Sequence, residues 1–128
     1  MIKKVLICLA LTVVLVTPAT AGEIQKSDFE VKTTRALVSL CSASPKDPLF
    51  VQAVNFCHGY LVGAFHYYAA SVSGEGDAQF VCLPDQRPSR NEIIAMFIAW
   101  AQDHPEYMRD LPVETEFRFL TEKWPCDH

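Results

Sequence analysis

The stretch Asn55-Phe56-Cys57-His58-Gly59-Tyr60-Leu61-Val62-Gly63-Ala64 lies in the middle of the longest periodic segment of the chain, from about Asp47 to Ser73. Apolar residues recur along this segment at the three- and four-residue steps of a helix face. At its start, Asp47 can cap free N–H groups, and Pro48 suits a first helical turn. We therefore predict a long central helix against which the other elements pack.

Two glycines, Gly59 and Gly63, stand one turn apart in this helix. Each costs about 1 kcal/mol of helix propensity relative to alanine. A membrane-embedded helix pair is disfavoured because polar residues and histidines stand close to the glycines. The spacing instead predicts that another backbone approaches closely, either that of the first helix or that of a second copy of the chain.

Two more helices are predicted from their starting residues. Ser27 and Glu30 have capping-box spacing at the start of a first helix that ends near Cys41. Ser89 and Glu92 repeat this spacing ahead of a third helix, which stops at His104-Pro105.

A last helix is predicted from about Val113 to Lys123. Its expected apolar face has steps of four, three and four residues and consists of Val113, Phe117, Leu120 and Trp124. The charged residues Glu114, Glu116 and Arg118 are expected to lie off that face. Nothing in the chain indicates a strand ladder. The fold class is therefore all-α, a compact bundle of about four helices.

The first 21 residues have the features of a signal peptide. Lys3 and Lys4 precede an apolar run, Val5 to Val16, which is too short for an ordinary membrane-spanning helix. Ala19-Thr20-Ala21 supplies the small residues that a signal peptidase requires. We expect cleavage before Gly22, which leaves residues 22–128 as one exported domain without a membrane anchor.

The charge balance argues against nucleic acid and anionic membranes as partners. The sequence has 11 Lys and Arg against 15 Asp and Glu. Loss of Lys3 and Lys4 leaves nine basic and fifteen acidic residues, a net charge of −6 with histidine neutral. Such a chain would be repelled by phosphates and suits a basic partner.

Four cysteines remain after the expected cleavage: Cys41, Cys57, Cys82 and Cys126. An even number in a small exported domain indicates two disulfides, and three connectivities are possible. Up-and-down packing of the helices would place Cys82 and Cys126 at one end of the bundle and Cys41 at the other. We therefore favour the pairs Cys41–Cys57 and Cys82–Cys126.

No motif indicates catalysis, a metal or a cofactor. Cys57 and His58 are neighbours on one helix, whereas a thiol hydrolase needs its histidine across a cleft from the thiolate. His58 and His66 are eight residues apart, roughly 12 Å along a helix, too far to share one metal ion. We therefore expect a protein that is not an enzyme and binds neither a metal nor a cofactor.

Four motifs, taken together and in this order, resemble the Rap/Tai family of type VI secretion immunity proteins. The motifs are Leu40-Cys41, Phe56-Cys57-His58-Gly59-Tyr60-Leu61-Val62-Gly63, Val81-Cys82-Leu83-Pro84 and Trp124-Pro125-Cys126. The family has a C-x-G-Y-x-x-G helix, a C-L-P turn and a terminal P-C, so the resemblance makes Gly59, Tyr60, Gly63 and Pro84 structural motif residues. It extends from about Phe29 to Cys126.

The resemblance implies a small, periplasmic, all-helical protein that is often a homodimer. Members of the family neutralise peptidoglycan amidases injected by neighbouring bacteria, and they do so by occluding the active-site groove. The motif residues carry the fold, so the resemblance transfers no inhibitory residue. On physical grounds we predict contact through the acidic loop, Ser73 to Gln79 with Glu75 and Asp77, and through Tyr67 and Tyr68 near its base. The connector from His104 to Leu111 is the second choice.

A different class of function is also compatible with the sequence. Acid-activated periplasmic chaperones are likewise small, helical, disulfide-bonded dimers, and they open as carboxylates become protonated. The fifteen acidic residues and the third helix, rich in Phe and Ile, permit this alternative. Dye binding and client protection at about pH 2–3 would distinguish such a chaperone from an immunity protein.

Overall fold

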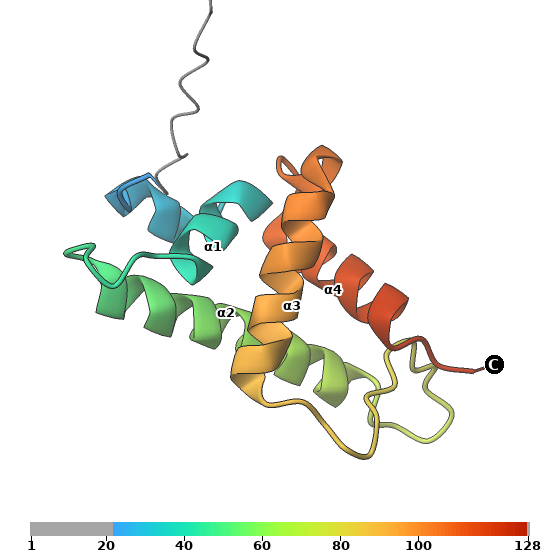
Figure 1. Cartoon of the computed structure of the whole chain (residues 1–128). Coiled ribbons are helices and arrows are strands. Elements are labelled where there is room, and N and C mark those ends of the chain that lie inside the picture. The colour runs from blue at the N-terminus through green and yellow to red at the C-terminus, as the bar shows by residue number, and fades with distance from the viewer. Residues whose placement is uncertain (1–21, 128) are drawn as a thin grey trace, which may run out of the picture.

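The computed structural model describes residues 22–127, so the predicted signal peptide lies outside the described residues (Figure 1). The elements in chain order are η1 Lys26–Glu30, α1 Thr34–Cys41, α2 Phe50–Ser71, α3 Arg90–Asp103, η2 Pro105–Tyr107 and α4 Pro112–Lys123, where η marks a short 3-10 helix. Within residues 22–127 the only extended pairing is an isolated bridge between Val81 and Pro125. The prediction of an all-α fold with about four helices is confirmed.

The long central helix is confirmed as α2, which begins a few residues after the predicted start. Asp47 stabilises the turn ahead of it rather than its first turn. One carboxylate oxygen of Asp47 accepts a hydrogen bond from the Leu49 N–H at 2.7 Å, and the other accepts one from the Ile24 N–H at 2.8 Å. Asp47 therefore also holds the N-terminal segment against the start of α2.

The predicted first helix is wrong in its first half, because the helical conformation is interrupted at Val31. Val31 has a φ of 49°, an unusual left-handed conformation for a β-branched residue, and it separates η1 from α1. The Ser27–Glu30 capping box does not form. Instead, the Asp28 carboxylate accepts a hydrogen bond from the Gln25 N–H at 2.9 Å. The α-helix proper begins after Thr33, whose hydroxyl accepts the Ala36 N–H.

The start of α3 is as predicted. The Ser89 hydroxyl accepts the Glu92 N–H at 3.3 Å, and the Glu92 carboxylate accepts the Ser89 N–H at 2.7 Å. These two hydrogen bonds satisfy donors that the first turn of a helix leaves free. The helix ends at Asp103, before His104 and Pro105, also as predicted.

The predicted apolar face of α4 is wrong by part of a turn. The residues that α4 buries are Pro112, Thr115, Glu116, Phe119 and Leu120. Val113 is exposed, and Glu116, which was expected to face solvent, is only 4% exposed. The polar residue Thr115 is fully buried because its hydroxyl lies 2.6 Å from that of Thr34 in α1.

The core lies where α1 packs against α2, α3 and α4 and where α4 packs against α2 and α3. Its most deeply buried apolar residues are Leu37, Leu40, Ala53, Cys57, Phe97 and Ala101. In Figure 1, α3 crosses α2 steeply instead of running antiparallel to it as an up-and-down bundle would.

Both favoured disulfides are confirmed. Cys41–Cys57 joins the end of α1 to the middle of α2, with 5.1 Å between the Cα atoms. Cys82–Cys126 joins the segment after the acidic loop to the C-terminal tail, with 4.9 Å between the Cα atoms. α1 is only eight residues long, which lets its last residue reach Cys57 within α2.

Candidate functional site

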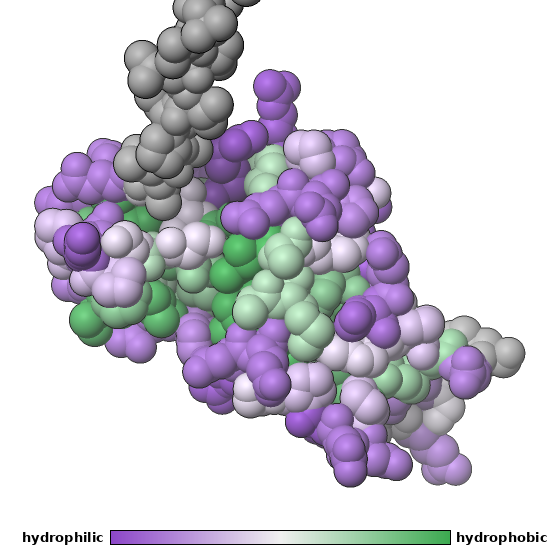
Figure 2. Space-filling view, in the orientation of Figure 1, coloured by the Kyte–Doolittle hydropathy of each residue, from purple (hydrophilic) through white to green (hydrophobic). Residues whose placement is uncertain are grey.

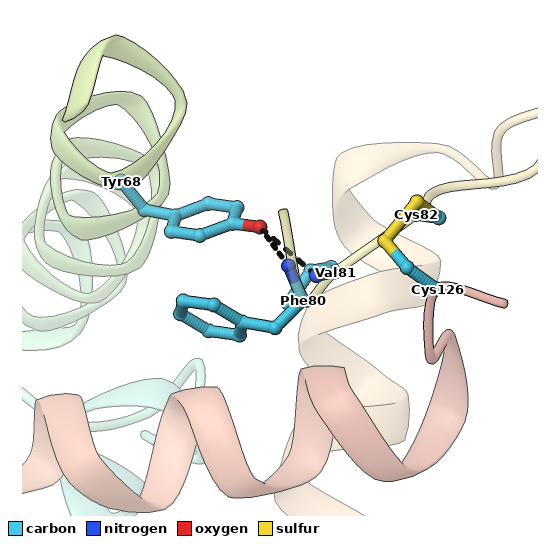
Figure 3. Close-up of a disulfide and its surroundings, with 5 residues drawn as sticks. All are labelled: Tyr68, Phe80, Val81, Cys82 and Cys126. Carbon is cyan, nitrogen blue, oxygen red and sulfur yellow. Dashed lines mark hydrogen bonds between the residues drawn. A yellow bond between two sulfur atoms is a disulfide. The ribbon is translucent and has the colours of Figure 1, made fainter. Parts of the chain in front are cut away.

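The segment that follows α2 is fixed to the protein at its base by a buried tyrosine. The hydroxyl oxygen of Tyr68 accepts hydrogen bonds from the backbone N–H groups of Phe80 and Val81, each at 2.9 Å (Figure 3). The Tyr68 ring also packs on those of Phe80 and Phe117, with centroids 4.5 and 5.2 Å apart. The two backbone donors, which have no helix or sheet partner, are thereby satisfied.

The same segment is held from its other side by the C-terminal tail. The Cys82–Cys126 disulfide lies immediately beside the Tyr68 hydrogen bonds (Figure 3). The Cys82 N–H donates to the Trp124 carbonyl at 2.9 Å, and Val81 pairs with Pro125. Residues 80–82 therefore form a fixed base from which the acidic loop, Ser73–Gln79, projects.

The acidic loop has some internal structure of its own. The Asp77 carboxylate accepts the Gly74 N–H at 2.7 Å, and the Asp77 N–H donates to the Gly74 carbonyl at 3.2 Å. Gly76 has a φ of 87°, which glycine adopts without strain. Asp77 thus holds the turn, while Glu75 is exposed and makes no hydrogen bond within residues 22–127.

The two tyrosines at the base of the acidic loop have different roles. Tyr67 is 79% exposed, as its position off the apolar face predicted. Tyr68 is 7% exposed and its hydroxyl is occupied by the two backbone donors. Tyr68 therefore supports the loop from inside and offers almost no surface to a partner. Phe80, which is 43% exposed, was not among the predicted contact residues.

The motif glycines Gly59 and Gly63 lie on a face of α2 that no other described element covers, and this face is called the bare face below. Gly59 and Gly63 are exposed, and a β-carbon at either would meet no atom of another element within 4 Å. The expected contact with the first helix is therefore absent from the described structure, and contact with a second copy stays a prediction. Of the other motif residues, Tyr60 is half-buried and Pro84 is exposed beyond Cys82.

The exposed face of α2 is unusual because it has no charge. From Phe50 to Ser71 the sequence contains no Asp, Glu, Lys or Arg, although Val51, Phe56 and Tyr67 are exposed. In Figure 2, apolar residues gather over the beginning of α2, at the lower left of the view. None of the helices between residues 22 and 127 combines the length and apolar character needed to cross a membrane.

The connector from His104 to Leu111, the second-choice contact region, is tied to the start of α1. The carbonyls of Asp110 and Met108 accept the Thr34 and Arg35 N–H groups at 2.9 and 3.1 Å. The His104 ring also stacks on the Trp100 ring, with centroids 4.0 Å apart. The connector therefore caps α1 and is a rigid part of the fold.

The structure offers no support for a thiol nucleophile or a metal centre among residues 22–127. All four cysteines of this range are in disulfides, and Cys57 is fully buried. No group of three or more His, Cys, Asp or Glu side chains in the same range is placed to hold a metal ion.

Sequence reasoning missed a cavity between α2, α3 and α4 that contains Glu116. The carboxyl oxygen Oε2 of Glu116 is buried without a hydrogen-bond partner, and burial raises the pKa of this group to about 9. The signal in the sequence was weak, because a glutamate in the middle of a helix ordinarily faces solvent.

Comparisons with known proteins place the chain in a family. No curated protein and no solved structure matches the chain. The model of the family described as Rap1a immunity proteins matches residues 33–126, which include α1 to α4 and all four cysteines of the two disulfides. Because the match covers most of the chain and almost the whole folded domain, this protein belongs to the Rap1a immunity proteins.

Proposed function

We propose that this immunity protein works in the periplasm by binding a peptidoglycan amidase delivered by type VI secretion and occluding its active site. The observation that carries the proposal is the family match over residues 33–126. Oxidised cysteines support an exported location, since disulfides persist outside the reducing cytosol. The protein itself catalyses no reaction in this proposal.

The contact surface that we propose consists of Tyr67, Glu75 and Phe80. These residues lie on the acidic loop or beside its fixed base, and all three are exposed. A loop held by a disulfide and by the Tyr68 hydrogen bonds loses little conformational freedom when it inserts into a groove. Exposed aromatic residues beside a charged group are typical anchors in protein interfaces.

The test is inhibition of the amidase encoded beside this protein, followed as peptidoglycan cleavage at rising concentrations of residues 22–128 with oxidised cysteines. We expect stoichiometric loss of activity, and we expect Tyr67→Ala and Glu75→Lys each to weaken inhibition at least tenfold. Glu75 is preferable to Asp77 for charge reversal because the Asp77 carboxylate holds the loop. No inhibition by the unaltered protein would refute the proposed function.

Two control variants separate the contact surface from the function. Glu122→Lys makes the same charge change at an exposed position of α4 and should inhibit normally. Glu106→Lys makes it in the connector, the alternative contact region. If the unaltered protein inhibits and only Glu106→Lys is defective, the amidase binds the connector and the acidic loop is the wrong surface.

We also propose that the protein is a homodimer through the bare face of α2. The two exposed glycines allow close approach of a second backbone, and the absence of charge from Phe50 to Ser71 removes the cost of desolvating ions. This contact would offset the helix propensity that Gly59 and Gly63 cost.

A further inference from the structure

The cavity between α2, α3 and α4 has the size and walls of a small-ligand site. Its volume is about 330 Å³, at the lower end of the range of about 300–1,000 Å³ for such sites. Its apolar walls include Leu61, Phe65, Ile94, Phe97, Phe119 and Leu120. Such walls favour a hydrocarbon group over a hydrated one.

Two arginines give the cavity a positively charged mouth. Arg87 and Arg90 both line the cavity and are exposed, as is the neighbouring His66 of α2. Among residues 22–127 the only ion pair joins Lys32 to Glu30, so neither arginine has a carboxylate partner there. In a chain rich in acidic residues, two guanidinium groups without such a partner at the mouth of an apolar cavity favour an anion.

Another part of the cavity wall is polar but uncharged. Glu116 lines the cavity, is 4% exposed and has an oxygen without a hydrogen-bond partner. Burial raises the pKa of this carboxyl group to about 9, so the group is protonated and uncharged at neutral pH. A buried polar atom without a partner costs free energy, which a hydroxyl or carbonyl of a ligand would recover.

Helix geometry gives the distance along α3 between two residues that line the cavity. Arg90, at the start of α3, and Phe97 both line it, and seven residues of helix correspond to about 10 Å. The charged mouth and the inner apolar wall are therefore separated by the length of a short hydrocarbon chain.

We propose that this cavity binds an anionic amphiphile, with its carboxylate or phosphate head on Arg87 and Arg90 and its hydrocarbon chain between α2, α3 and α4. A polar atom on the chain contacts Glu116. The site is separate from the acidic loop, and its occupation does not depend on amidase binding.

The experiment measures binding to residues 22–128 by titration calorimetry, with three probes that share one chain: octanoate, octanol and octylammonium. We expect saturable binding of octanoate, with octanol at least tenfold weaker and octylammonium weaker still. Absence of octanoate binding, or equal binding of the three probes, would overturn the proposal.

Variants locate the two ends of the ligand. Arg87→Gln with Arg90→Gln should weaken octanoate binding at least tenfold, whereas Arg35→Gln with Arg109→Gln, which removes two other exposed arginines, should leave it unchanged. All four positions are exposed, so the fold should persist, and circular dichroism checks this. Unchanged binding by the Arg87/Arg90 variant would overturn the assignment of the head group.

At the inner end, 8-hydroxyoctanoate should bind more tightly than octanoate, and Glu116→Leu should abolish the difference. Equal binding of the two acids to the unaltered protein would remove Glu116 from the site.

Cosedimentation with phosphatidylglycerol vesicles distinguishes the source of the ligand. Sedimentation that octanoate prevents identifies a membrane lipid, and octanoate binding without sedimentation identifies a free acid.

Discussion

At the scale of single residues, Glu116 has the most unusual environment in residues 22–127. Tyr60 and His66 of α2, Arg87 ahead of α3 and Arg90 in α3 are the titratable or charged side chains around Glu116 or on its cavity. None of them forms an ion pair with it. Burial therefore dominates, and Glu116 holds its proton at neutral pH.

This protonation predicts that stability falls as pH rises. Below pH 4.5 both the folded and the unfolded state hold the proton, whereas between 4.5 and about 9 only the folded state does. In that interval the free energy of unfolding decreases by about 1.4 kcal/mol per pH unit. Glu116→Gln should therefore stabilise the protein by roughly 3 kcal/mol or more at pH 8 and by much less at pH 5, as urea unfolding at both pH values would measure.

The control for this measurement is Glu122→Gln in the same helix, where the side chain is exposed and the effect should be a few tenths of a kcal/mol at either pH. An equal gain from Glu116→Gln at pH 5 and pH 8 would mean that the effect comes from packing. A loss at pH 8 would mean that Glu116 is ionised in the folded protein.

At the scale of elements, the sequence predicted those whose signals are local. The Ser89–Glu92 box formed because both partners lie within one turn and nothing competes with them. The same spacing at Ser27 and Glu30 failed because η1 begins at Lys26, so Ser27 lies inside it, and η1 ends at Val31, whose side chain is buried in the core and whose backbone is left-handed. Tertiary burial there prevailed over the local pattern.

The misplaced face of α4 has the same cause. Hydrophobic periodicity predicted that Glu116 faces solvent because it uses only the polarity of each side chain and no tertiary contact. The buried pair of hydroxyls, Thr34 and Thr115, holds this side of α4 against α1, and Glu116, the next residue along the chain, lines the cavity. A hydrogen bond between residues 81 positions apart leaves no periodic signal. For the same reason the cavity was not predicted. The exposure of Tyr67 was predicted, because it follows from the periodic pattern of one helix.

The bare face of α2 carries a prediction of its own. If it joins two copies, Gly63→Glu should place a charge in the contact and shift the protein from dimer to monomer in analytical ultracentrifugation. A β-carbon at Gly63 meets no atom of another element within 4 Å and the position is exposed, so the fold should survive. Ala99→Glu, at an exposed position of α3, is the matched control and should leave the dimer intact. A monomeric unaltered protein would contradict the proposed contact.

At the scale of the whole molecule, the structure contains few groups whose protonation could open the fold as an acid-activated chaperone requires. The one ion pair among residues 22–127 is exposed, and acidification leaves the already protonated Glu116 unchanged. Hydrogen bonds from Ser89 lower the pKa of Glu92, so its contribution to stability is lost as pH falls through that lowered value. This loss affects one exposed helix start and gives no reason for the core to open.

The two disulfides divide the molecule into two regions, and their removal should affect these regions separately. Cys41–Cys57 closes a separation of 16 residues beneath α1, and Cys82–Cys126 closes one of 44 residues around the acidic loop. In the chain-entropy account, loss of the first costs about 3 kcal/mol and loss of the second about 4 kcal/mol.

Hydrogen exchange of the Cys82→Ala/Cys126→Ala variant should show faster exchange at Phe80 and Val81, whose N–H groups depend on a fixed base, with little change in α1. The Cys41→Ala/Cys57→Ala variant is the control and should expose α1 first, because Cys57 is part of the core beneath it. If both variants exchange faster everywhere to the same extent, the domain unfolds as one unit and the acidic loop has no independent base.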